Sequence, residues 1–126
     1  MELIFRITLF ITGIINLLPF TLVFLPEKMS KSYGIDISNP NLELLLRHRA
    51  VLFGIVGGLM LYAALMKTHY YLSTAIGLMS MISFVVLYFH IGGINQELKK
   101  VMMIDVIASI ILLLVAIIYF VHSKNK

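Results

Sequence analysis

VMMIDVIASIILLLVAIIYFV, residues 101–121, contains a single charged residue, Asp105. An α-helix of about 20 predominantly apolar residues crosses the roughly 30 Å hydrocarbon core of a bilayer. We therefore interpret residues 101–121 as a membrane-spanning helix, and Asp105 as a residue that needs a specific reason to lie within it.

Three more apolar stretches precede this one, at residues 3–25, 44–66 and 70–91. Of the 126 residues, 60% are hydrophobic and 13% are charged, whereas soluble domains have about 45–50% apolar and about 25% charged residues. Short connections favour an antiparallel arrangement. We expect one domain, residues 1–126, that forms an all-α, up-down bundle of four transmembrane helices with both termini on one side. The expected location is the cell membrane, a bacterial inner membrane in the simplest case.

The first apolar stretch also has the position of a signal peptide. It contains Asn16 and Pro19, lacks a small-x-small cleavage site, and is followed by further spans. These features favour a mature span over a cleaved leader.

The connections carry local signals for helix ends. Residues 26–34 begin with proline and end with Gly34, which predicts a short interfacial helix between the first two spans. Asn39 followed by Pro40 is typical of a helix N-terminus, and Asn95 is a candidate cap for the last helix. The basic residues are divided almost equally between the two sides, so the orientation in the membrane stays open.

Composition excludes several classes of site. The chain has no cysteine, which excludes disulfides, iron–sulfur clusters and Cys-ligated zinc. The net charge of +4 collects at helix ends, which favours lipid headgroups over nucleic acid as the partner. His48 and His90 lie on one side and His69 and His122 on the other, so only same-side pairs could bind one haem, and His48 points away from the packing face, which disfavours haem. We expect no metal and no cofactor.

Small residues predict where the helices approach each other. Gly54-x-x-x-Gly58 has the spacing that allows close helix contact, and Gly57 falls within the same arc. The complete set of predicted packing residues is Gly13, Asn16, Gly54, Gly57, Gly58, Gly77 and Ala108.

A charged pair is predicted between the second and fourth spans. Arg47 lies near the glycine arc, whereas His48 and Arg49 point away from it, toward headgroups or a neighbour. Asp105 lies on the smallest and most polar face of its helix. At 1.5 Å per residue, Arg47 is about 10 Å from the start of its helix and Asp105 about 14 Å from the start of its own. Similar depth on the same side predicts an Arg47–Asp105 ion pair, because an arginine keeps a nearby carboxylate charged.

Other polar residues come from the same membrane side. With the predicted pair they define a candidate polar vestibule open to one leaflet, made of Arg47, Asp105, Tyr88, His90, Asn95 and Glu97.

Several segments resemble a group of short bacterial four-span membrane proteins of DoxX-like layout. The most specific segment is LRHRAVLFG, residues 46–54, and others are NLLP at 16–19, YGI at 33–35, NPNL at 39–42 and GGINQEL at 92–98. The resemblance implies the four-span architecture and supplies no reaction. Some members of the group carry the label phosphopantetheine adenylyltransferase, which this chain contradicts because it lacks that enzyme's fold and motif.

Three functions remain open. The first, which we favour, is a non-enzymatic membrane module that binds a lipid headgroup or a partner through the polar cluster. The second is an oligomeric transporter or proton-coupled carrier in which Asp105 titrates. The third is a membrane enzyme that acts on a lipid or isoprenoid, with Asp105 or His90 as its acid or base. The expected partners are membrane lipids and either further copies of the chain or a larger membrane complex.

Overall fold

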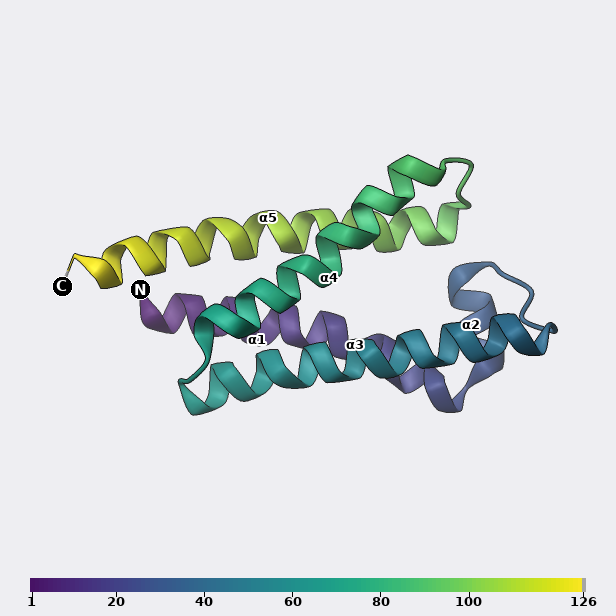
Figure 1. The fold of residues 1–126 in the computed structure, drawn as a ribbon, viewed down its shortest axis with the longest axis horizontal. Helices are drawn as coiled ribbons and strands as arrows, with labels where there is room; N and C mark the ends of the chain where they lie inside the picture. Colours follow the sequence, from purple (N-terminus) through teal and green to yellow (C-terminus); the bar gives the residue numbers. More distant parts are fainter. Residues whose placement is uncertain (126) are drawn as a thin grey trace.

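The computed structural model describes residues 1–125, which form helices without any β-strand (Figure 1). In chain order the elements are α1 (Glu2–Leu17), the 3-10 helix η1 (Leu18–Phe24), α2 (Pro26–Tyr33), α3 (Pro40–Met66), α4 (Tyr70–Ile91) and α5 (Gln96–Lys124). The all-α fold class is therefore confirmed.

The long helices run up and down, and both termini lie at the same end of the bundle (Figure 1). Four segments of the described chain are long and apolar enough to cross a membrane: Glu2–Phe24, Pro40–Met66, Tyr70–Ile91 and Gln96–Lys124. The 27 residues of α3 and the 29 residues of α5 correspond to lengths of about 40 and 44 Å. Both helices thus extend beyond the hydrocarbon layer of a typical bilayer.

The first span, expected over residues 3–25, is made of two kinds of helix. Its α-helix ends at Leu17, and residues Leu18–Phe24 continue as a 3-10 helix. Pro19 explains the change, because proline has no N–H for the carbonyl of residue 15 and its ring crowds that carbonyl. The hydroxyl of Thr21 donates a hydrogen bond of 2.8 Å to the Leu18 carbonyl within this tighter segment.

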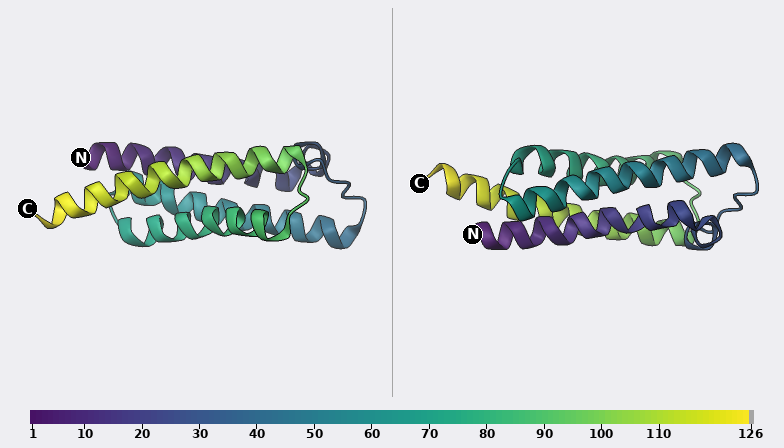
Figure 2. Two further views of the ribbon diagram at one scale, coloured as in Figure 1. Left: turned by 90° about the horizontal axis from the view of Figure 1, so that it is seen from above. Right: turned by 90° about the horizontal axis from the view of Figure 1, so that it is seen from below.

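The short helix α2 lies across the end of the bundle away from the termini (Figure 2). Gly34 ends it in the left-handed conformation, with φ 62°, as expected. Its Met29 and Tyr33 are buried against the bundle. The predicted caps are also confirmed: the Asn39 side chain accepts from the amide of residue 41, and that of Asn95 accepts from the amide of residue 98.

Glycines set the closest helix contacts. A Cβ added to Gly57 would lie 2.6 Å from the Gly13 carbonyl oxygen, and one added to Gly54 would lie 2.6 Å from the Phe20 ring. A Cβ added to Gly77 would meet the sulfur of Met60 at 2.7 Å.

Gly58 corrects the packing prediction, because a Cβ there meets no atom within 4 Å in the described chain. Of the two glycines in the GxxxG spacing, Gly54 lies at a close helix contact and Gly58 does not. The reason is that α1 and η1 cover the side of α3 that carries Gly54 and Gly57. The other two predicted packing residues, Asn16 and Ala108, are buried.

Candidate functional site

A cavity of about 340 Å³ opens at the α2 end of the bundle, between the first span, α3 and α5. We call it the Arg49–Asp105 cavity. Its lining residues are Ile15, Asn16, Leu18, Pro19, Thr21, Leu22, Tyr33, Arg49, Phe53, Val101, Ile104 and Asp105. Mostly apolar walls with a few polar groups, in a volume of about 300–1,000 Å³, are typical of small-molecule sites.

Each wall follows from a local feature of the sequence. A 3-10 helix places residues three apart on one face, so Leu18 and Thr21 both line the cavity from η1. The α2 helix brings Tyr33 against the bundle. Arg49 and Asp105 come from the first halves of α3 and α5.

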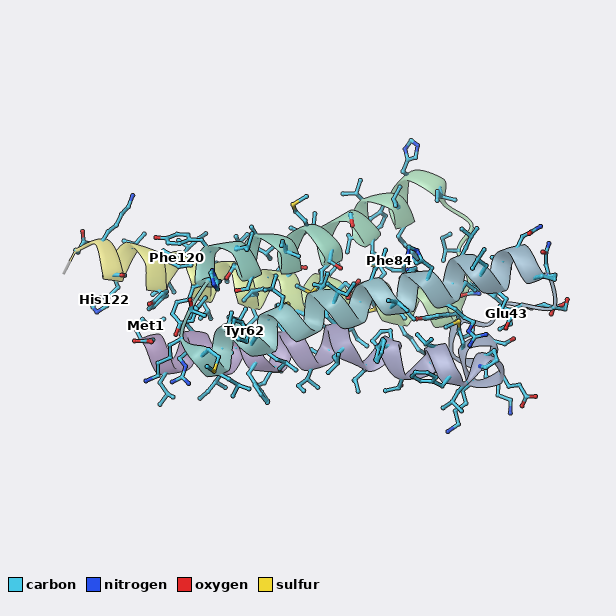
Figure 3. The ribbon with its side chains drawn as sticks, turned by 60° about the horizontal axis from the view of Figure 1, so that its bottom comes forward. Met1, Glu43, Tyr62, Phe84, Phe120 and His122 are labelled. Atoms are coloured by element: carbon cyan, nitrogen blue, oxygen red, sulfur yellow. The ribbon has the colours of Figure 1, made fainter. Side chains whose placement is uncertain are left out.

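Arg49 is surrounded by aromatic rings. Its guanidinium carbon lies 4.6 Å from the centroid of Phe53, 5.1 Å from that of Phe84 and 5.5 Å from that of Tyr33. Figure 3 shows Phe84 between α4 and α3. The cation–π contacts stabilise the positive charge of Arg49, but they do not provide the oxygen acceptors that its N–H groups need. The Nη2 atom of Arg49 is buried and has no hydrogen-bond partner among the described residues.

Asp105 supplies the opposite charge in the same cavity. It is 8% exposed, and it lies close enough to Arg49 for a Coulombic attraction. Among residues 1–125, the ion pair closer than 4.0 Å joins Arg47 and Glu43, so Arg49 and Asp105 make no direct salt bridge. The half-buried Arg49 and the buried Asp105 therefore line a common cavity without a direct salt bridge.

Arg47 does not belong to this site, and the predicted Arg47–Asp105 pair is wrong. The Nε atom of Arg47 donates to the Val23 carbonyl at 2.8 Å, and its Nη1 atom pairs with Glu43 at 3.2 Å. Arg47 thus fixes the end of η1 to α3, and Arg49 takes the position that we had predicted for Arg47.

A different periodicity in the sequence identifies Arg49. Steps of four and three residues lead from Arg49 through a stripe on α3 that faces the bundle interior: Arg49, Phe53, Val56, Met60 and Ala63. The glycines mark the contact with the first span, which is one side of α3. Centring the helix on them turned Arg49 outward in the prediction.

The remaining predicted vestibule residues do not line the cavity. Asn95 donates to the carbonyl of Tyr33 at 2.8 Å and so holds α2 against the start of α5. Glu97 is exposed beside Gly34, His90 is exposed, and Tyr88 is half-buried beside the ring of Phe89. Asn95 therefore positions the Tyr33 wall, whereas the other three take no part in the site.

The cavity opens on the outer surface of the bundle. Leu18 and Ile104, which line it from the first span and α5, are 59% and 49% exposed, and Thr21 is exposed as well. In a bilayer this surface would face lipid. The site therefore combines an apolar entrance with two opposite charges inside.

No protein-family model, no curated protein and no solved structure matches this chain. The resemblance to DoxX-like proteins therefore stays a prediction. The geometry of the Arg49–Asp105 cavity is the basis for the functional proposal below.

Proposed function

We propose that this protein is a non-enzymatic module of the cell membrane that binds the polar head of a membrane lipid in the Arg49–Asp105 cavity. One observation carries the proposal: a guanidinium with an unpartnered, buried Nη2 atom lines a cavity that opens between exposed apolar side chains.

Buried charge is the first support. A charged group without its hydrogen bonds is costly to keep away from water, unless a ligand or water supplies the missing acceptors. Arginine presents five donors in a planar fork that matches the oxygens of a phosphate. Phospholipids carry such a phosphate in their headgroup. A bound phosphate would compensate Arg49 where the protein itself does not.

Access is the second support. The exposed Leu18 and Ile104 stand on the two sides of the opening. A lipid could place its head inside while its acyl chains stay against these side chains and the surrounding bilayer. Of the two acid or base candidates of the enzymatic alternative, Asp105 lines the cavity, whereas His90 is exposed and lies outside it.

Native mass spectrometry of the protein purified in a mild detergent tests the proposal. We expect the wild type to retain one lipid per chain and Arg49→Gln to lose most of it, with Arg49→Lys between the two. Arg6→Gln is the matched control, since Arg6 donates to the Ala64 carbonyl at 2.7 Å and does not line the cavity. Equal retention by the wild type and a folded Arg49→Gln variant would overturn the proposal.

A further inference from the structure

We propose that the lipid head is zwitterionic and carries a primary ammonium as well as a phosphate, with the phosphate at Arg49 and the ammonium at Asp105. This inference rests on the proposed function and deepens it, since it names the class of headgroup.

The charges of the cavity favour a ligand with both signs. Arg49 and Asp105 line the same space and make no direct salt bridge. A purely anionic head would gain the attraction of Arg49 and would also suffer the repulsion of the Asp105 carboxylate. A zwitterionic head can satisfy both groups, and such complementarity of charge is how a site discriminates among similar ligands.

Hydrogen-bonding capacity favours a primary ammonium at Asp105. An ionised carboxylate only accepts hydrogen bonds, and an ammonium group has three N–H donors. Asn16 adds another acceptor to the same lining, because its Nδ2 donates to the Thr12 carbonyl at 3.0 Å and its Oδ1 remains as an acceptor. Hydrogen bonds between charged groups are about twice as strong as neutral ones.

The aromatic rings argue against a quaternary ammonium. Proteins bind choline-like groups in cages of aromatic side chains. Here Tyr33, Phe53 and Phe84 already surround the guanidinium of Arg49, each with its centroid within 5.5 Å. The ring faces are thus engaged by the protein's own cation, and the carboxylate is the group left for a ligand cation.

Binding competition between lipids of equal chain length provides the test. Purified wild-type protein is stripped of lipid, mixed with phosphatidylethanolamine, its N-methylated derivatives, phosphatidylcholine and phosphatidylglycerol, and analysed by native mass spectrometry. We expect occupancy by phosphatidylethanolamine to exceed that by phosphatidylcholine and by phosphatidylglycerol by roughly fivefold or more, a ratio that corresponds to about 1 kcal/mol. Occupancy should fall stepwise as methyl groups replace the N–H donors.

A variant then assigns the preference to Asp105. Asp105→Asn should still bind phospholipid through Arg49, and its ratio of phosphatidylethanolamine to phosphatidylglycerol should fall to about one or lower, because the like-charge repulsion is gone. Asp105→Glu should keep the wild-type preference. Asp36→Asn is the control, since Asp36 is exposed in the loop before α3.

The outcomes separate the two proposals. Equal binding of all the headgroups, lost together in Arg49→Gln, would overturn the zwitterion inference and keep the lipid-binding function. A preference for phosphatidylglycerol or phosphatidylcholine would overturn it as well. Absence of any retained phospholipid would remove both. The methylation series needs no variant, so it decides the question even where a substitution at Asp105 prevents folding.

Discussion

The two ends of the bundle use the same kinds of side chain in different ways. At the end with the termini, the ring of Phe5 is fully buried, 4.6 Å from Tyr119 and 5.0 Å from Tyr70 between ring centroids. At the α2 end, three rings surround the charged Arg49 beside a cavity of about 340 Å³. Figure 3 places Met1 and His122 at the first end and Glu43 at the second.

Polar groups follow the same contrast. Near the termini, two polar side chains are paired across helices: the Tyr70 hydroxyl donates to Glu2 at 2.9 Å, and Arg6 donates to the Ala64 carbonyl. At the α2 end, Arg49 and Asp105 face a common space without a direct salt bridge. Aromatic bulk and a pocket are present at both ends, so the α2 end differs by the two opposite charges that line its cavity, which a purely structural bundle would avoid.

The largest expected effect compares two phenylalanines. Phe5→Ala should remove a fully packed ring and cost about 3–5 kcal/mol of stability. Phe53→Ala should cost less than half of that, because Phe53 is half-buried and already borders the cavity. Thermal unfolding in detergent, followed by circular dichroism, measures both. Equal losses would show that the α2 end is as tightly packed as the other and would break the comparison.

A smaller effect concerns two neighbouring glycines. A Cβ at Gly57 would lie 2.6 Å from the Gly13 carbonyl and 2.7 Å from the Leu17 amide, and neither backbone group can move alone. Gly57→Ala should therefore cost about 1–3 kcal/mol through overpacking, despite the better helix propensity of alanine.

Gly58→Ala is the matched control for this substitution. It gains the same helix propensity and meets no atom within 4 Å in the described chain, so its unfolding temperature should stay the same or rise. Loss of stability in Gly58→Ala, accompanied by a change of oligomeric state, would place a second copy of the chain on that side of α3.

Local signals in the sequence predicted much of the fold. Asn39 and Asn95 cap α3 and α5, and Gly34 ends α2, because a cap depends on a few adjacent residues. The apolar stretches predicted the long helices for a similar reason. The change to a 3-10 helix after Leu17 could have been suspected from Pro19 alone, although its extent depends on how η1 packs against α3.

The site was only half predictable. Asp105 was placed correctly in the interior, since α5 has one small and polar face. The choice between Arg47 and Arg49 depends on which sides of α3 meet the first span and α4, and both sides carry small or apolar residues. Helix periodicity shows which residues share a side of α3, but it does not show which side faces the bundle interior. The prediction took the glycine side as the interior, whereas that side faces the first span.

The smallest predicted effect tests the assignment of Arg49 and Asp105 to one site. In a double-substitution cycle, Arg49→Gln and Asp105→Asn should couple by about 1 kcal/mol, because residues that share a network lose non-additive amounts of stability. The coupling should be modest, since the two side chains face a cavity and make no direct salt bridge.

Arg47→Gln supplies the control cycle. Arg47 binds Val23 and Glu43, so the stability losses from Arg47→Gln and Asp105→Asn should add within about 0.5 kcal/mol. Unfolding temperatures of the wild type and the three variants in each cycle, converted to free energies, give both couplings. A larger coupling for Arg47 than for Arg49 would return the charged pair to Arg47 and would separate Arg49 from the cavity's chemistry.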